Sequence, residues 1–143
     1  MNAYSEMKHR HQLEINAFPM FLAFNNEQFD RGMRKFGLDP ADTNKIYRFK
    51  NISGYYLREN ADKLWDMLKR HEQELTSAIE NDATGDGFIF EMFDYELANH
   101  EFIVSGDVSD TFDVLGLTLD EIKSDGKLLH GLKKAIIAQR EGD

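Results

Sequence analysis

The sequence predicts an α+β fold in a single domain of residues 1–143: a small three-stranded antiparallel N-terminal sheet with a helical C-terminal two-thirds. Hydrophobic residues make up 41% of the chain, which is enough to bury a core without disulfides. Short apolar runs bounded by turn residues lie between residues 20 and 58, whereas the later segments repeat with a helical period. No internal repeat or Pro/Gly-rich linker divides the chain.

The first sixty residues are expected to hold two helices and three strands. Asn25, followed three residues later by Gln28, is typical of a capped helix start, and Gly37 suits the end of that helix. The apolar run 20–24 predicts a strand buried on both faces. The turn at residues 51–54 predicts a hairpin. The expected elements are a helix at 4–16 that ends before Pro19, strands at 20–24, 45–49 and 54–58, and a helix from Asn25 to about Phe36.

The remaining residues predict helices. Residues 60–81 place Leu64, Leu68, His71 and Leu75 on one apolar stripe with Trp65 beside it. A helix that is apolar nearly all round is usually central, and residues 88–101 have that character. The expected helices are 60–81, 88–101, a short one at 107–115 ending at Gly116, one that begins at a Thr118–Glu121 capping box, and 126–139.

The composition excludes several classes of site. The chain has no cysteine, which excludes disulfides, thiolate zinc sites and cysteine nucleophiles. It shows no phosphate-binding loop, dinucleotide fingerprint or serine elbow, so we expect no cofactor and no catalytic residue of those kinds. No apolar run approaches the roughly 18 residues of a membrane helix, and the N-terminus lacks a signal-peptide stretch. We therefore expect a cytoplasmic protein that does not bind membranes.

The negative charge is concentrated in one third of the chain. Between Asp82 and Asp125 twelve acids face a single base, Lys123, for a local net charge of 1 − 12 = −11, against −9 for the whole protein. Predicted helix starts and the capping box account for four of these acids. These four are Asp86, Asp107, Asp120 and Glu121. Of the other eight, Asp82 belongs to the loop at residues 82–93 that is considered below, and seven are left without such an explanation: Glu91, Asp94, Glu96, Glu101, Asp110, Asp113 and Asp125.

We hypothesise that part of this charge forms a protein-binding face. The partner-binding residues we expect are Asp94, Glu101, Asp107, Asp110 and Asp113. Carboxylates three apart on a helix lie roughly 5–6 Å from each other, a spacing comparable to that of successive phosphates. The expected function is a non-enzymatic nucleic-acid mimic that binds a basic, nucleic-acid-binding protein. Direct binding of nucleic acid is disfavoured because an acidic domain repels phosphate. A solvated acidic face without a partner is the plainer alternative.

Two other function classes stay open at this stage. The first is a small metal-dependent enzyme that uses the acids and histidine of residues 86–101, although no His-x-x-x-His or Glu-x-x-His spacing supports it. The second is a homo-oligomeric structural protein whose apolar helix 88–101 forms the subunit interface. The residues of the enzyme alternative are Asp86, Glu91, Glu96, His100 and Glu101.

Residues 82–93 partly follow the pattern of a calcium loop. Asp82 and Asp86 stand at its first and fifth positions, and Gly87 stands at the sixth. The third position is Thr84, and the last, where a bidentate glutamate is required, is Phe93. We therefore expect no calcium site but a turn between two helices, with Asp86 as its cap.

A basic and aromatic hairpin is the remaining candidate for a binding surface. Its members are Tyr47, Tyr55, Tyr56, Arg48, Lys50 and Arg58. Aromatic rings beside cations can stack nucleic-acid bases. Because residues 1–81 hold twelve acids and twelve bases, we interpret this patch as an ordinary sheet surface.

Three segments carry a resemblance to known proteins, namely Phe-Leu-Ala-Phe-Asn at 21–25 with Phe29, residues 87–101 from Gly-Phe-Ile to Glu-Leu-Ala-Asn-His-Glu, and Leu-Gly-Leu-Thr at 115–118. Together they resemble a group of small acidic proteins of unknown function from phages and mobile elements of Gram-positive bacteria. The resemblance covers about residues 20–135. It implies a phage-type accessory protein, and acidic inhibitors of host nucleases, including anti-CRISPR proteins, recur among such proteins. It brings no known activity and no catalytic residue.

Overall fold

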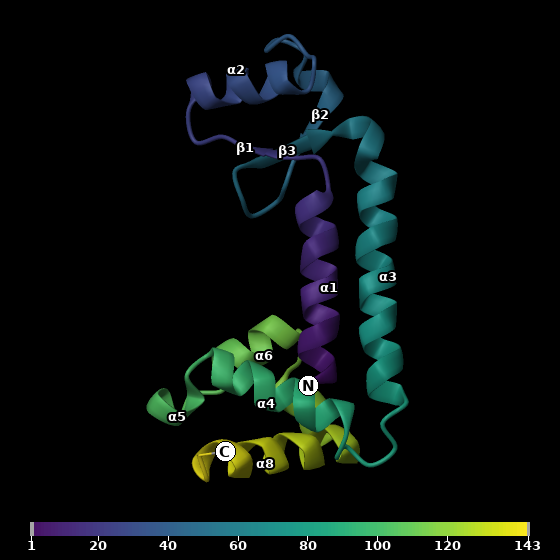
Figure 1. Cartoon of the computed structure of the whole chain (residues 1–143), viewed down its shortest axis with the longest axis vertical. Coiled ribbons are helices and arrows are strands. Elements are labelled where there is room, and N and C mark those ends of the chain that lie inside the picture. The colour runs from purple at the N-terminus through teal and green to yellow at the C-terminus, as the bar shows by residue number, and fades with distance from the viewer. Residues whose placement is uncertain (1, 143) are drawn as a thin grey trace. The chain divides into compact units, whose positions relative to one another are not determined.

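The chain divides into two compact units. The structure, a computed structural model, describes residues 2–142, and most of its helices and strands are labelled in Figure 1. One unit holds the residues up to Gln12 together with those from Gln73 onward, and the other holds Leu13–Glu72. The boundary falls inside α1 (Ala3–Ala17) and α3 (Ala61–Glu80), so each of these helices contributes to both units. The expectation of a single domain stays a prediction.

The mixed helix and strand composition is confirmed, with a small three-stranded antiparallel sheet between residues 21 and 57. The helical part is largely C-terminal, as expected, but it is not confined there. In chain order α1 precedes the sheet, and α2 (Asn26–Lys35) comes between the first and second strands. None of the helices within residues 2–142 is long and apolar enough to cross a bilayer.

In the Leu13–Glu72 unit, the sheet packs against one helix. The strands are β1 (Phe21–Leu22), β2 (Ile46–Arg48) and β3 (Gly54–Leu57), in the order β1-β3-β2. The Phe21 and Tyr55 rings lie opposite each other and stack with centroids 5.3 Å apart. Helix α2 begins at the predicted cap, where the Asn25 side chain accepts a hydrogen bond from the Gln28 amide. The core consists of Phe21, Ala23, Met33 and Ile46, with Phe29, Phe36, Leu38, Tyr55 and Leu57 packed against it. The 3₁₀ helices η1 (Thr43–Lys45) and η2 (Arg58–Asn60) flank the hairpin.

The prediction of a strand at 20–24 buried on both faces is wrong. The strand itself spans only Phe21–Leu22. Phe21 and Ala23 are buried, whereas Leu22 is 53% exposed and Phe24 is 74% exposed. The alternation arises because β1 is an outer strand whose side chains reach the α2 core only at every second residue. The uniformly apolar sequence conceals this period of two.

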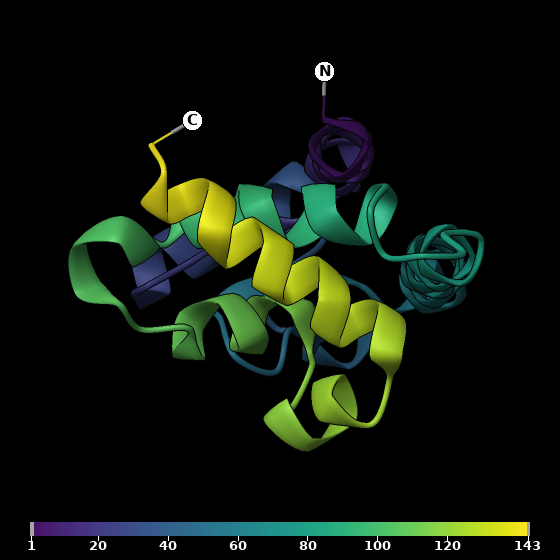
Figure 2. The ribbon, with the colours of Figure 1, turned by 90° about the horizontal axis from the view of Figure 1, so that it is seen from below.

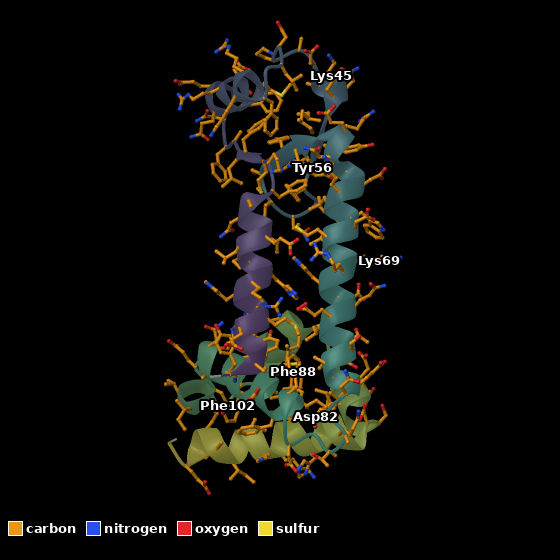
Figure 3. All side chains as sticks on the ribbon, turned by 45° about the vertical axis from the view of Figure 1, so that its right-hand side comes forward. Lys45, Tyr56, Lys69, Asp82, Phe88 and Phe102 are labelled. Atoms are coloured by element: carbon orange, nitrogen blue, oxygen red, sulfur yellow. The ribbon has the colours of Figure 1, made fainter. Side chains whose placement is uncertain are left out.

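The other unit is built on α4 (Phe88–Asn99) packed against α8 (Gly126–Arg140). Figure 2 shows these two helices side by side, with α5 (Phe102–Ser105), α6 (Ser109–Leu115) and α7 (Leu119–Lys123) following the edge of the pair. Figure 3 shows Phe88 and Phe102 near the two ends of α4. The expectation that the apolar helix at 88–101 is central is confirmed, since Ile89, Phe93 and Leu97 are fully buried. Four further apolar residues of the two helices are buried, namely Met92 on α4 and Leu128, Leu132 and Ala135 on α8.

The apolar stripe predicted for α3 is only partly buried. Met67 and His71 are buried, but Leu68 is 43% exposed and Trp65 is 69% exposed. In the Leu13–Glu72 unit, His71 lies against α1, where its Nε2 atom is 2.9 Å from a carboxylate oxygen of Glu14. A contact with one neighbouring helix covers a narrower strip than the broad apolar face of a core helix. The apolar period of residues 60–81 therefore predicted the helix correctly, but it predicted a wider buried face than the structure shows.

The Glu14 carboxylate provides a test of this packing. Hydrogen bonds from Arg70 and then from His71 lower the pKa of Glu14 from its ordinary value of 4.5 to about 2. A carboxyl whose pKa is lower in the folded chain stabilises the fold above its unfolded value, and this stabilisation is lost as the pH falls to the folded value. We expect the melting temperature of the wild type to fall more steeply between pH 4.5 and pH 2 than that of Glu14→Gln. Circular dichroism melts over this range measure both slopes, and parallel slopes would contradict the expectation.

Candidate interaction surface

Residues 101–120 follow one another in the unit that includes the chain from Gln73 onward, and the exposed residues among them are here named the 101–120 surface. Glu101 has a left-handed backbone conformation, with φ of 55°, between α4 and α5. Phe102 is buried and anchors α5. Thr111 is fully buried, and its hydroxyl donates a hydrogen bond of 3.3 Å to the backbone carbonyl of Glu96, which anchors α6 on α4. Phe102 and Thr111 thus fix α5 and α6 to the unit, and the acidic residues of this stretch are exposed to solvent.

The inward positions of α6 determine which of its residues face the solvent. Thr111 is buried, and Val108, Phe112 and Leu115 pack against the core. Because residues three and four apart share a face of a helix, the opposite face consists of the exposed residues Asp110, Asp113 and Val114. The two aspartates therefore point away from the core together.

Few of the twelve acids between Asp82 and Asp125 are neutralised by basic side chains. Within residues 2–142, only Asp86 and Glu96 lie within 4 Å of a lysine, arginine or histidine. Several others are hydrogen-bonded to backbone amides or to an amide side chain. Four exposed carboxylates show neither a hydrogen bond nor an ion pair in the described part of the chain, namely Glu101, Asp110, Asp113 and Asp120.

The five residues predicted to bind a partner do not form one group. Asp110 and Asp113 share the outer face of α6, and Glu101 is exposed at the start of the same stretch. Asp107 is exposed, but it accepts a hydrogen bond of 2.8 Å from the Ser109 amide, and this bond lowers the pKa of Asp107. Asp94 is different. It is half-buried on α4 and accepts a hydrogen bond of 2.8 Å from the Gln139 side chain of α8. Asp94 is thus occupied inside the unit, and the role of all five in binding stays a prediction.

Asp120 belongs to this surface although its sequence position suggested a capping role. The predicted capping box is confirmed, but it uses Thr118 and Glu121, whose side chains and amides bond reciprocally at 3.1 and 3.2 Å. The Asp120 carboxylate is exposed and takes no part in the cap. A sequence signal was present, since a box completed by Thr118 and Glu121 does not use the side chains of the two residues between them, Leu119 and Asp120. The opposite holds for Asp125, which the sequence left without a structural explanation. Its side chain caps α8 by accepting hydrogen bonds from the amides of Lys127 and Leu128.

Aliphatic side chains are exposed between these carboxylates. Val104 is 82% exposed and Ile103 is 59% exposed on α5, while Val114 on α6 is 50% exposed. Leu119, which is 48% exposed, lies directly before Asp120. Scattered single apolar residues are normal on a protein surface, and those exposed here add apolar contact area to a stretch that also carries the exposed carboxylates.

The residues of the enzyme alternative are not brought together. Asp86 lies 2.6 Å from His130 and 3.4 Å from Lys134, and its hydrogen bond with His130 lowers its pKa. The Glu91 carboxylate accepts a hydrogen bond from the Ala3 amide at 3.0 Å. Within residues 2–142 the exposed Glu101 carboxylate shows no hydrogen bond or ion pair, and Glu96 and His100 are the pair in this set that lies within 4 Å. No group of three or more His, Asp or Glu side chains within residues 2–142 is arranged to hold a metal ion.

Glu96 is the centre of a buried polar network that joins α1 to α4. Its carboxylate is fully buried and accepts hydrogen bonds from the Tyr4 hydroxyl at 2.6 Å and from the Lys8 ammonium at 2.8 and 3.1 Å. Burial and the hydrogen bond to Glu96 raise the pKa of Tyr4 far above its ordinary value, so its hydroxyl remains a donor. The His100 Nε2 atom lies 3.9 Å from Glu96, too far for a hydrogen bond. With its oxygens occupied by Tyr4 and Lys8, this carboxylate has a structural role.

Asp82, and not Asp86, organises the turn that resembles a calcium loop. Figure 3 shows Asp82 in the loop that follows α3. One carboxylate oxygen accepts a hydrogen bond from the Gly85 amide at 3.0 Å, and the other accepts bonds from Gly87 at 3.1 Å and Ile89 at 3.0 Å. Burial raises the pKa of Asp82, but these amide bonds together outweigh it and lower the pKa. The expectation that Asp86 caps the turn is therefore wrong, because its carboxylate pairs with α8.

Comparisons with known proteins give a family but no activity. No curated protein matches the chain, and no solved structure matches it. One family model matches residues 3–138, which covers all of the Leu13–Glu72 unit, most of the other unit and the whole 101–120 surface. The match also covers Tyr4, Lys8 and Glu96, the three residues of the buried network. The chain belongs to this family, a family of unknown function designated DUF7659.

Proposed function

We propose that the protein is a non-enzymatic interaction protein whose 101–120 surface binds a positively charged surface of another protein. One observation carries the proposal: exposed carboxylates without partners in the described chain alternate with exposed aliphatic side chains along this stretch. The carboxylates give charge complementarity and a fast approach to a basic partner, and the aliphatic residues give contact area.

The distribution of charge between the two units supports this role. The unit that contains the 101–120 surface has 7 basic and 17 acidic residues, a net charge of 7 − 17 = −10. The Leu13–Glu72 unit has 10 basic and 9 acidic residues, a net charge of 10 − 9 = +1. The acidic excess of the whole protein therefore belongs to one unit, and a basic partner is attracted to that unit.

We propose further that the partner is a nucleic-acid-binding protein. Asp110 and Asp113 are three residues apart on α6, a spacing that places Cβ atoms roughly 5–6 Å from each other. A basic cleft that binds phosphates in succession accepts negative groups at such intervals. A phage-type origin and an inhibitory role against a host defence protein, including anti-CRISPR activity, stay predictions of the resemblance alone.

The two other function classes have less support. The residues of the metal-dependent enzyme are dispersed among separate partners, as described above. The homo-oligomeric alternative stays a prediction, and it would need a surface other than the buried side of α4, since Ile89, Met92 and Phe93 are already packed inside the unit.

A charge-reversal experiment tests the proposal. The variant Glu101→Lys/Asp110→Lys/Asp113→Lys is compared with Glu59→Lys/Asp66→Lys/Glu72→Lys, which changes the net charge equally at exposed acids of the other unit. Proteins are captured from a bacterial lysate, and each one retained by the wild type is purified and titrated directly by calorimetry. We expect the 101–120 variant to bind at least about tenfold more weakly, because like charges brought together across an interface cost several kcal/mol.

The control and the salt dependence decide the outcome. The control variant should retain wild-type affinity, and high salt should weaken binding of the wild type. A short DNA duplex should compete with the protein for the partner. If both variants bind as the wild type does, or if the two lose affinity equally, the 101–120 surface is not the binding site and the proposed function is wrong.

A further inference from the structure

The Leu13–Glu72 unit carries a second exposed surface, of opposite charge. Three adjoining hollows meet at Phe24, which is 74% exposed, and Leu22 and Ile52 on their rims are 53% and 49% exposed. Their lining includes three cations and none of the acids of the described chain. The cations are Arg31, Lys35 and Arg48, and together with Leu22, Phe24 and Ile52 they are named here the Phe24 surface.

These cations are available to a ligand. Lys35 and Arg48 show no ion pair in residues 2–142, and Arg31 pairs only with Glu27, one turn earlier on α2, at 3.1 Å. Both members of that pair are largely exposed, and exposed pairs of this kind contribute little free energy. A carboxylate from a partner therefore displaces Glu27 at small cost.

The Phe24 surface includes an open strand edge. In the sheet order β1-β3-β2, β1 is an outer strand. The Ala23 amide donates a hydrogen bond of 2.9 Å to the Ser53 carbonyl, and Leu22 lies opposite Gly54. Because successive residues of an antiparallel strand alternate in direction, the N–H and C=O groups of Leu22 point away from β3. They face the side on which no strand of the described chain pairs.

Helix α2 holds two of the cations beside this edge. Gly32 permits the close approach, since a Cβ atom there would lie 2.1 Å from Cδ1 of the Phe21 ring. Arg31 and Lys35, four residues apart and thus on one side of α2, line the same hollow as Leu22 and Phe24. Main-chain hydrogen-bonding groups, cations and an exposed ring are therefore present together.

We infer that the Phe24 surface binds an extended, acidic segment of a partner protein, which adds to the sheet along the open edge of β1. The main chain of the segment pairs with Leu22, as in other cases of strand addition to a sheet edge. Its acidic side chains meet Arg31 and Lys35, and an apolar side chain covers Phe24. The inference is independent of the 101–120 surface, which belongs to the other unit.

The observations favour a peptide over a single-stranded nucleic acid. A nucleic acid gains affinity by stacking successive bases on several exposed rings, whereas Phe24 is the single aromatic side chain of this surface with high exposure. The unpaired main-chain groups of Leu22 match those of a peptide.

Peptide probes test the inference directly on the full chain. Fluorescence anisotropy measures binding of a labelled octapeptide that alternates glutamate and valine. Three comparison probes are the same peptide with lysine for glutamate, the same peptide with every second backbone nitrogen methylated, and an oligo-dT octamer. We expect the glutamate peptide to bind at least about tenfold more tightly than each of the others, because each lacks the charge or the main-chain donors the site uses.

Matched variants locate the site. Lys35→Glu is expected to weaken binding of the glutamate peptide at least about fivefold, while Arg34→Glu, the same change at a neighbouring exposed position outside the lining, leaves it unchanged. Phe24→Ala should weaken binding, and Trp65→Ala, the loss of an equally exposed ring on α3, should not. Glu101→Lys/Asp110→Lys/Asp113→Lys should bind the peptide as the wild type does. Equal binding of the methylated peptide, tighter binding of oligo-dT, or equal effects of the paired variants would overturn the inference.

Discussion

Replacing Lys8 by methionine is expected to lower the free energy of unfolding by about 3 kcal/mol. Lys8 donates to both oxygens of the fully buried Glu96 carboxylate, at 2.8 and 3.1 Å, and the substitution leaves that carboxylate without a cation. Removing one partner of a buried ion pair typically costs about 3–5 kcal/mol, because the remaining charge is unpaired. The lower end applies here, since the Lys8 side chain is 38% exposed and water reaches its end of the pair.

A double variant separates loss of the pair from loss of packing. If an uncompensated charge destabilises Lys8→Met, then Lys8→Met/Glu96→Leu, which removes both charges, should recover much of the loss. Lys133→Met removes an exposed lysine of α8 and should change the stability by less than about 0.5 kcal/mol. Urea unfolding followed by circular dichroism measures all of them. A double variant as unstable as Lys8→Met would show that unpaired charge is not the cause.

Gly85→Ala is expected to destabilise the same unit by a similar amount, about 3 kcal/mol. Gly85 has φ of +89°, and a Cβ atom there would lie 2.3 Å from the backbone carbonyl oxygen of Lys127, at the start of α8. A left-handed conformation costs a non-glycine residue roughly 1–2 kcal/mol, and overpacking adds about 1–3 kcal/mol. A backbone atom cannot move aside as a flexible side chain can, so the turn and α8 must separate.

Gly116→Ala is the matched control for this variant. Gly116 also has a positive φ, +66°, and belongs to the same unit, but a Cβ atom there would meet nothing within 4 Å. Its substitution should therefore cost only the backbone share, about 1–2 kcal/mol. Thermal and urea unfolding of both variants measure the difference. Equal losses would show that the close approach of residue 85 to α8 is not a source of destabilisation.

The two proposed binding surfaces can be tested independently of each other. The 101–120 surface offers carboxylates to a basic partner, and the Phe24 surface offers cations and a strand edge to an acidic one. They belong to different units, so a variant of one surface leaves the other intact. A protein that binds through both surfaces would bring two partners of opposite charge together.

The sequence alone determined the features that depend on residues a few positions apart. The cap formed by Asn25 and Gln28, the capping box of Thr118 and Glu121, and the left-handed Gly37 that ends α2 all follow from local hydrogen bonding and backbone freedom. Helix periods were equally readable, because the positions that pack inward recur every three to four residues. The concentration of acids between Asp82 and Asp125 also needed no structure.

Only the tertiary structure decided which of these acids are free. Glu96 and Lys8 are 88 residues apart in sequence, Asp86 meets His130 across 44 residues, and Asp94 meets Gln139 across 45. No local pattern encodes such pairs, so Asp94 seemed as available as Asp110 and Asp113. The exposure of Phe24 was hidden for the same reason, because an apolar run does not tell which of its faces a distant helix covers. Local sequence therefore determines where helices and their caps form, while contacts between residues distant in sequence determine which side chains remain exposed to a partner.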